Sequence, residues 1–316
     1  MGQQLANALA PVFFVMALGY FAGKRGIVDN KNLKSLINFV MMFALPCSLF
    51  VAIAKTPRSV VLQYGNLILV LLVIYLIIYG IAYFEQRKLH GEDAGVSAVH
   101  ALTVAFPNNA SIGLPLLGSV FGPQSALAVA IGIAVGSMTI SPITLAVLES
   151  RTPAGRALPA SRRVLTAVWR SVTKPVVLGP TFGVLFALAG FQIPQTASLC
   201  LTLIGQATAG GALFLTGLIL SAQPFKIDSS VISGVSMANI IQPALAFGLV
   251  RMLGMPATIA GEAVLLAAIP TGFFGLVFGA GYDTKPVASS SSLIGSSVLS
   301  VVTLAVWIVL IHIGIH

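Results

Sequence analysis

Two prolines lie in the middle of long apolar runs, and each is followed by amides, hydroxyls or glycines. A proline inside a helix removes one backbone hydrogen bond and clashes with the carbonyl one turn earlier. Because unpaired polar groups are costly in lipid, we expect both helices to open here and line a polar cavity. Their N-terminal ends carry partial positive charge, which predicts an anion site without a buried cation. The residues assigned to this site are Pro107, Asn108, Asn109, Ser111, Pro270, Thr271 and Gly272.

Other polar or helix-breaking residues within apolar runs are candidates for lining the pathway to this site. Asn239 and Gln242 share one helix face at a spacing of three, beside Pro243, and hydrogen bonding between helices is the alternative role for them. Pro46, within the sequence ALPCSLF, is a further pathway candidate. For His100, both proton relay and simple packing stay open.

The elements that must position these residues belong to a membrane protein. Of the 316 residues, 57% are hydrophobic and 8% are charged, whereas about a quarter of a soluble domain is charged. Ten apolar runs are each long enough to cross about 30 Å of hydrocarbon as a helix. The sequence therefore predicts an all-α integral membrane protein with ten transmembrane helices. The runs lie near 5–23, 34–54, 63–84, 97–120, 124–148, 173–190, 198–221, 230–251, 258–281 and 288–311.

The distribution of basic residues predicts the orientation in the membrane. Fourteen of the 17 Lys and Arg residues fall in the loops after odd-numbered runs. Since cytoplasmic loops carry the excess of Lys and Arg, we expect these loops inside the cell and both termini on the outer side. The same bias accounts for the net charge of +9 without nucleic acid as a partner.

A basic cytoplasmic loop is predicted over 151–172, and it divides the chain into two groups of five runs, 1–150 and 173–316. An odd number of spans in each half forces the halves into opposite orientations, which predicts an inverted repeat. The fourth run contains AFPNNASIGLPLLG and the ninth contains AIPTGFFGLVFGAG. We therefore expect the two interrupted helices to be counterparts that meet near the midplane.

No enzyme class is indicated. The sequence contains no HExxH, GxSxG or phosphate-binding loop and no His/Cys cluster with metal-ligand spacing. We expect no enzymatic activity, no catalytic residue, no metal site and no bound cofactor. None of the eight acidic residues is predicted at mid-depth, which disfavours a proton pump or cation antiporter.

Several segments resemble the auxin efflux carrier family over nearly the whole chain. They include FALPCSLF, TVAFPNNASIGLPLLGSVFG and GFFGLVFGAG, and GIVDNKN, ITLAVLE and WRSVTKP are similar to its bacterial malonate carrier branch. The resemblance implies broken, crossing fourth and ninth helices in a bacterial cytoplasmic-membrane transporter that moves organic anions by an elevator-like motion. It also implies a scaffold from helices 1, 2, 6 and 7, which mediates homodimers, and a transport domain from helices 3–5 and 8–10. Plant members have a charged pair in the third span, where this chain has Tyr75 and Tyr79.

The expected function is therefore secondary transport of a small organic anion, with malonate as the favoured substrate. Asn108 and Asn109 are predicted to donate hydrogen bonds to carboxylate oxygens, while the opened helix ends supply N–H groups. A dianion without a full positive charge beside it is costly to desolvate. Binding of the monoanion, symport with a proton and symport with Na⁺ all stay open. The alternatives are a carrier for another weak organic acid (auxin-like or another dicarboxylate), a channel or a membrane sensor.

Overall fold

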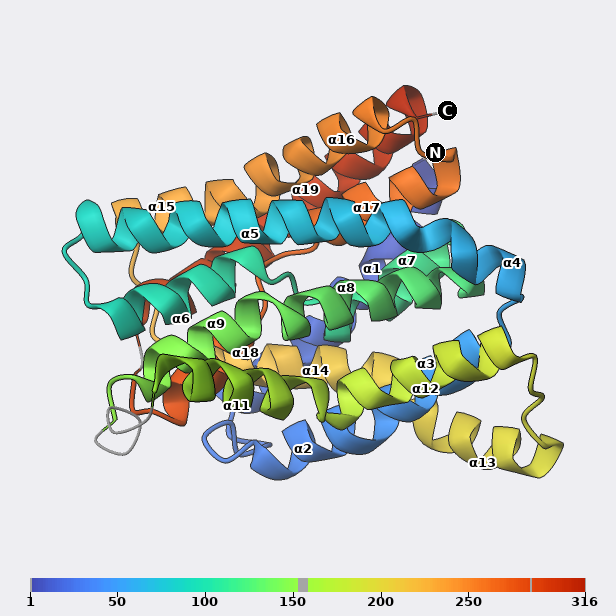
Figure 1. Cartoon of the computed structure of the whole chain (residues 1–316). Helices are drawn as coiled ribbons and strands as arrows, with labels where there is room; N and C mark the ends of the chain where they lie inside the picture. The colour runs from blue at the N-terminus through green and yellow to red at the C-terminus, as the bar shows by residue number, and fades with distance from the viewer. Residues whose placement is uncertain (1, 153–158, 285, 316) are drawn as a thin grey trace.

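The computed structural model describes residues 2–152, 159–284 and 286–315. Within these ranges the regular structure is helical, and the one extended pairing is an isolated antiparallel bridge between Pro107 and Thr271. Figure 1 shows long helices running side by side, with both termini at the end of the molecule that carries α4 (Arg58–Val61) and α13 (Gln195–Gly205). The all-helical class predicted from composition is confirmed.

Helices cover each of the first five apolar runs. They are α1 (Gly2–Lys24), α2 (Lys34–Asn38), η1 (Phe39–Ala44), α3 (Leu45–Ala54), α4, η2 (Leu62–Tyr64), α5 (Gly65–Lys88), α6 (Ala94–Ala105), η3 (Asn109–Gly113), α7 (Leu114–Phe121), η4 (Pro123–Ser125), α8 (Ala126–Met138) and α9 (Ile140–Glu149).

The second half of the described chain is built in the same way. Its helices are α11 (Ala160–Val172), α12 (Pro175–Ala189), α13, α14 (Ala207–Ala222), α15 (Ser229–Ser236), η5 (Met237–Ile241), α16 (Gln242–Met252), α17 (Ala257–Ala268), α18 (Phe274–Ala280) and α19 (Val287–Gly314).

Seven continuous helical stretches of the described chain are long and apolar enough to cross a membrane. The apolar helices α6, η3–α7, α12 and α17 are shorter. The fourth and ninth predicted runs are each interrupted, because α6 and α17 stop before a proline and a new helix begins several residues later. The prolines therefore break these helices rather than only bending them.

Three π-helical turns precede three other prolines. The segments η1, η3 and η5 each end two residues before a proline, and these prolines are Pro46, Pro115 and Pro243. A proline ring clashes with the carbonyl of the preceding turn in a regular α-helix, and a wider turn relieves that clash. Each proline can therefore be accommodated without ending its helix.

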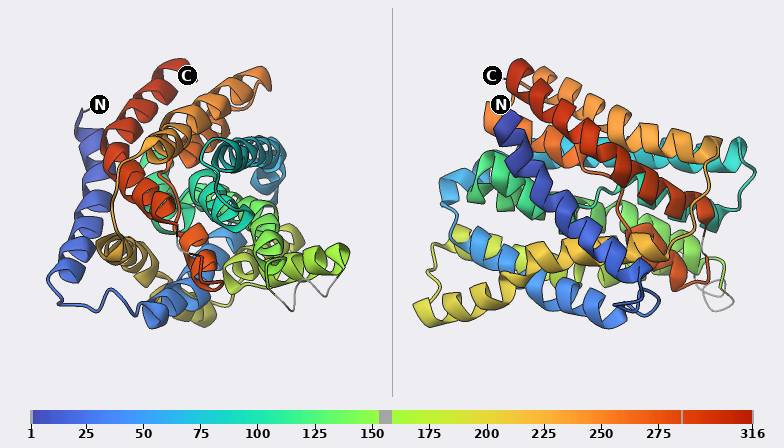
Figure 2. Two further views of the ribbon diagram at one scale, coloured as in Figure 1. Left: turned by 90° about the vertical axis from the view of Figure 1, so that its left-hand side faces the viewer. Right: turned by 180° about the vertical axis from the view of Figure 1, so that it is seen from behind.

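Glycines allow α1 and α14 to approach closely. A β-carbon at Gly217 would collide with the backbone oxygen of Met16, and one at Gly19 would collide with that of Phe214. Seen from behind in Figure 2, α1 crosses α14 and runs beside α19. Such small-residue contacts replace the hydrophobic driving force that lipid removes between membrane helices.

The predicted basic loop 151–172 is helical over α11 (Ala160–Val172), and ion pairs of Arg151 and Arg170 tie its described residues to the ends of α6 and α9. Asp93 accepts hydrogen bonds from the backbone N–H groups of Gly95 and Val96, at 2.8 and 3.0 Å, and pairs with Arg151 at 2.7 Å. Arg170 on α11 pairs with Glu149 at 2.6 Å. Residues 153–158, which include the counted Arg156, and Lys285 lie outside the described residues.

Two Gly→Ala substitutions test the α1–α14 contact, because we expect them to change the stability of the protein differently. We expect Gly217→Ala to destabilise the protein by about 1–3 kcal/mol, because the added methyl group overpacks the α1–α14 contact. Gly248→Ala on α16, where an added β-carbon meets no atom within 4 Å, should instead be neutral or stabilising by about 0.5–1 kcal/mol. The thermal unfolding midpoint in detergent measures both effects, and a similar midpoint for the two variants would contradict this packing.

Candidate functional site

The two interrupted segments pair with each other through their backbones. The N–H of Asn108 donates to the carbonyl of Pro270 at 2.9 Å, and the N–H of Gly272 donates to the carbonyl of Phe106 at 2.8 Å. The crossing therefore joins the break between α6 and η3 to the break between α17 and α18. It satisfies backbone groups that would otherwise be unpaired inside an apolar bundle.

Small and aromatic residues make this approach possible. A β-carbon on Gly272 would collide with the backbone oxygen of Phe106, so a larger residue would separate the two segments. The Phe106 ring stacks on Phe274 with centroids 5.1 Å apart, which ties the ends of both breaks together. Gly136 on α8 lies against the other part of the Phe106 ring.

The crossing contains buried polar atoms without a hydrogen-bond partner among the described residues. These atoms are the Oδ1 atoms of Asn108 and Asn109 and the Oγ of Ser111. All three residues are at most 1% exposed. Since unpaired buried polar groups cost about 1–3 kcal/mol each, their clustering indicates a site for a hydrogen-bonding guest.

The amide nitrogens of both asparagines already have partners. Asn108 Nδ2 donates to Thr216 Oγ1 on α14 at 3.2 Å, and Asn109 Nδ2 donates to Tyr75 Oη on α5 at 2.9 Å. One of the two amide hydrogens of each asparagine is therefore occupied in this arrangement, and the other has no hydrogen-bond partner among the described residues. Turning the Asn109 amide would expose its donors and let Tyr75 donate to Oδ1, because a phenol can donate or accept. Asn108 has no such exchange available. The Thr216 hydroxyl donates its hydrogen to the carbonyl of Ala212, so its oxygen is left to accept from the Asn108 amide.

A hydrogen-bond network on α19 supports the other side of the crossing. The N–H of Thr271 donates to Ser296 Oγ at 3.0 Å, and Ser296 Oγ donates to Asn239 Oδ1 at 2.5 Å. Asn239 Nδ2 donates in turn to the carbonyl of Ser296 at 3.0 Å. Asn239 thus lies two hydrogen bonds away from the crossing, through Ser296, and bonds neighbouring helices.

Gln242 and Pro46, the remaining pathway candidates, have other neighbours. Gln242 Nε2 lies 3.4 Å from the carbonyl of Ala105, at the end of α6, and its Oε1 is buried without a partner among the described residues. Pro46 packs against Gly179 of α12, where a β-carbon would lie 2.8 Å from its backbone. Gln242 therefore adjoins the crossing, while Pro46 lies at a helix contact.

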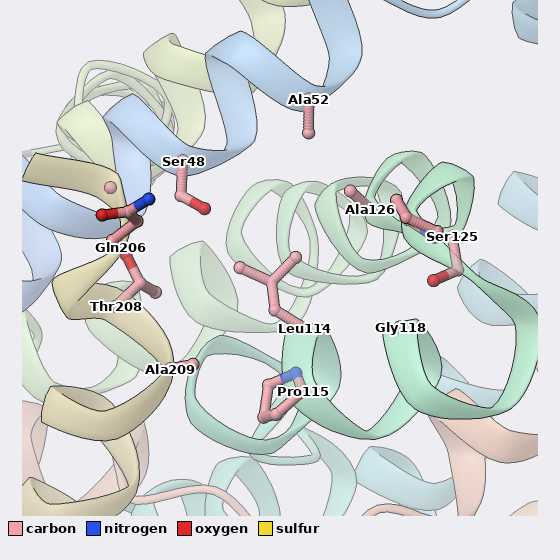
Figure 3. A pocket seen from close by; sticks show the side chains of 12 residues that line it. Ser48, Ala52, Leu114, Pro115, Gly118, Ser125, Ala126, Gln206, Thr208 and Ala209 are labelled. Carbon is pink, nitrogen blue, oxygen red and sulfur yellow. The ribbon is translucent and has the colours of Figure 1, made fainter. Parts of the chain in front are cut away.

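One cavity approaches the crossing from the end that carries the termini. It has a volume of about 290 Å³ and lies among α3, α7, the start of α8 and the junction of α13 with α14 (Figure 3). Ser48, Gln206 and Thr208 supply polar side chains, and the Thr208 hydroxyl has no partner within the described part of the chain. Leu114, the first residue of α7, forms part of the wall nearest the crossing.

A second cavity approaches from the opposite end. It has a volume of about 390 Å³ and is lined by the segment before and within α2, by the end of α14 and by α18. Along α14, Thr208 lines the first cavity, Thr216 contacts Asn108, and Ala222 lines the second. Ala209 also lines the first cavity and Ile219 the second, so at about 1.5 Å per residue Thr216 lies roughly 10 Å along α14 from one cavity and roughly 5 Å from the other. The second cavity reaches the crossing at Phe273, whereas the first is lined by Leu114, which directly follows the crossing residue Gly113.

Comparison with known proteins identifies the family. The family described as "Membrane transport protein" matches residues 5–308. The chain belongs to this family. It is thus a multi-pass membrane transporter, a class of proteins that are not enzymes. Among the described residues, no group of three or more His, Cys, Asp and Glu side chains is placed to hold a metal ion.

The chain is similar to transporters from bacteria and plants along almost its whole length. It is 28% identical over 305 residues to the uncharacterized transporter YfdV of Escherichia coli, covering 95% of each chain. It is 24% identical over 322 residues to the "Putative malonate transporter" of Rhizobium meliloti, covering 98% of this chain and 97% of the relative. It is 21% identical to auxin efflux carrier component 8 of Arabidopsis thaliana, covering 97% of each. The predicted membership of the auxin efflux carrier family is confirmed.

Sequence reasoning missed the partners of the site. The sequence marks Tyr75 only as standing in place of a charged pair, and it does not assign Thr216 to the site. Tyr75, Thr216 and Ser296 are polar residues that contact the crossing from other helices. Nothing in their local sequence distinguishes them from residues that bond one helix to the next.

The network under Thr271 can be tested with two serines on one helix. We expect Ser296→Ala to lower stability by about 1–3 kcal/mol, because it leaves the Thr271 N–H and Asn239 Oδ1 without their partner. Ser300→Ala is the matched control, since the Ser300 hydroxyl bonds only within α19, to Ser297. The thermal unfolding midpoint of each purified variant measures the difference. Equal midpoints would mean that the network does not hold the crossing.

Proposed function

We propose that the protein is a secondary active transporter for a small organic anion, with malonate as the favoured substrate. The observation that carries the proposal is the crossing itself, where buried polar atoms without partners among the described residues lie between two cavities. The similarity to a protein whose name includes malonate transport supports the choice of substrate.

The chemistry of the crossing suits a carboxylate. The helix that starts at Asn109 and continues through α7 directs its N-terminal end to the crossing, where its dipole favours negative charge. The N–H groups of Asn109, Ser111 and Ile112 already donate to nearby carbonyls, so they act on an anion through this dipole. Asn109 can turn its donors toward the substrate when Tyr75 exchanges roles from acceptor to donor. Asn108 gains its second free donor when its contact with Thr216 opens, so that both amide hydrogens can face a carboxylate. Substrate binding is thereby linked to separation of the crossing from α14.

The proposed motion follows from this link. We propose ten membrane passes, in which α6 with η3–α7 and α17 with α18 each form one broken pass of an inverted repeat. The passes containing α5, α6–α9 and α15–α19 form the transport domain, and those containing α1, α3, α12 and α14 form the scaffold. The crossing lies at the boundary, because Asn108 contacts Thr216 across it. Sliding of the transport domain would connect the crossing to one cavity at a time, as an elevator mechanism requires.

We also propose a cellular location, an orientation and an oligomeric partner for the protein. We propose the bacterial inner membrane, with both termini on the outer side and a homodimer formed through the scaffold. No Lys, Arg, Asp or Glu belongs to the proposed crossing residues, 106–113 and 269–274. Since a dianion is costly to bury without a counter-charge, the monoanion or symport with H⁺ or Na⁺ reduces this cost.

Counterflow in proteoliposomes tests the transport activity. Vesicles loaded with unlabelled malonate should accumulate labelled malonate faster than empty vesicles, with saturation, because a carrier exchanges its substrate one molecule at a time. Uptake without saturation would indicate a channel, and binding without counterflow would indicate a sensor. Competition by other dicarboxylates and by auxin-like acids, with imposed pH and Na⁺ gradients, separates the alternative substrates and the coupled ions.

The role of Asn108 gives a residue-level prediction. Asn108→Ala should reduce counterflow at least about tenfold, because it removes a donor and acceptor from a desolvated carboxylate site, where a lost charge-assisted hydrogen bond costs about 1.5–3 kcal/mol. Asn66→Ala, at an exposed asparagine of α5, is the control and should transport normally. Malonate should also raise the unfolding midpoint of the Asn66 variant and not that of the Asn108 variant. An unchanged malonate effect in Asn108→Ala would contradict the assignment.

A further inference from the structure

The cavity beside α2 differs in charge from the cavity at the other end. Its wall includes Lys31 and Lys34, and the amides of Asn30, Asn32, Asn38 and Gln223 lie around the same space. The cavity near the termini is lined by no charged residue of the described chain. Of these two cavities, only the one beside α2 therefore presents basic side chains to an anion.

Neither lysine is neutralised within the described part of the chain. Both residues are exposed, and no ion pair involves the ammonium group of either one. The acid nearest in sequence, Asp29, accepts a hydrogen bond from the backbone N–H of Lys31 at 2.9 Å and does not line the cavity. The positive charge of the two side chains thus stays available to a ligand.

The floor of this cavity adjoins the crossing. Phe273, the residue after Gly272, lines the cavity and is itself 1% exposed. Its ring stacks on Phe274 with centroids 5.4 Å apart, and Phe274 stacks on Phe106. This buried aromatic layer lies between the lysine-lined space and the paired backbone of the crossing.

We propose that this cavity is a peripheral binding vestibule for small carboxylates, in which Lys31 and Lys34 attract the anion before it reaches the crossing. A cleft lined by one sign of charge concentrates the oppositely charged ligand and raises its association rate, and salt screens the effect. The inference rests on the proposed function. It assigns attraction of the anion to the end of the molecule that carries α2, opposite the termini. Lysines serve this step well because a long, hydrated ammonium group releases its ligand readily.

The local potential can be measured without any transport. A single reporter thiol is placed on the cavity wall by Val277→Cys, in a background carrying Cys47→Ser and Cys200→Ser. The ratio of its reaction rates with an anionic and a cationic methanethiosulfonate reports the charge around it. We expect Lys31→Gln with Lys34→Gln to lower the anionic-to-cationic ratio at least about threefold at low salt, and the difference to shrink in about 0.5 M salt.

A matched pair of basic residues controls for net charge. Lys24→Gln with Arg25→Gln removes the same charge from the same loop, and neither residue lines the cavity. This pair should leave the ratio nearly unchanged. An equal change in both pairs, or no change in the Lys31 and Lys34 pair, would overturn the vestibule.

Transport kinetics then test whether the vestibule serves the substrate. In everted membrane vesicles, Lys31→Gln with Lys34→Gln should raise the KM for malonate about three- to tenfold at low salt and leave the maximal rate unchanged, because recruitment precedes the transport step. In right-side-out vesicles the KM should not change. The same KM change on both faces would overturn the recruiting role. If the unmodified protein shows no malonate counterflow, the proposed substrate is wrong, while the thiol reaction rates still decide the vestibule.

Discussion

Pairing of two interrupted backbones is the interaction on which the rest of the structure depends. In lipid, a backbone group that leaves its helix must find a partner within the protein. The prolines free such groups at two places far apart in sequence, and the bonds from Asn108 to Pro270 and from Gly272 to Phe106 satisfy them mutually. This requirement explains why a glycine follows Thr271, where a β-carbon would collide with Phe106. It also places α5, α14 and α19 around the crossing, because each supplies a side chain that bonds to it.

In the proposed transporter, the substrate and the contact with Thr216 share the amide group of Asn108. While Asn108 donates to Thr216, the crossing is tied to α14 and one of the two amide hydrogens is occupied. A bound carboxylate would replace the Thr216 contact and thereby release the crossing from α14. A ligand shifts a conformational equilibrium only by its different affinity for the two states. In the proposed transporter, this exchange of partners would supply such a difference.

The sequence predicted the helices and the position of the breaks better than the partners of the site. Apolar runs mark helix ranges directly. A proline followed by polar residues or glycines in such a run does not suit a continuous helix that faces lipid, so the interruptions of the fourth and ninth runs were expected. The two segments were also expected to meet, although the paired bonds were not. Tyr75, Thr216 and Ser296 contact the site across separations of 34, 108 and 25 residues, which no local pattern encodes. The helical state of α11 was missed because its arginines interrupt the apolar pattern.

The crossing residues 106–113 and 269–274 include no charged side chain, and this has a physical reason in a carrier, which must release its substrate. A lysine buried beside a carboxylate would hold it strongly, since an ion pair is poorly screened inside a protein, and removal of the substrate would leave an unpaired buried charge. Amides, hydroxyls and helix N–H groups bind an anion less strongly and leave only neutral groups behind. In the proposed mechanism, full positive charge lies instead at Lys31 and Lys34, where water stabilises it when the cavity is empty. Attraction and passage would then occur at different places, so strong recruitment would not slow release from the crossing.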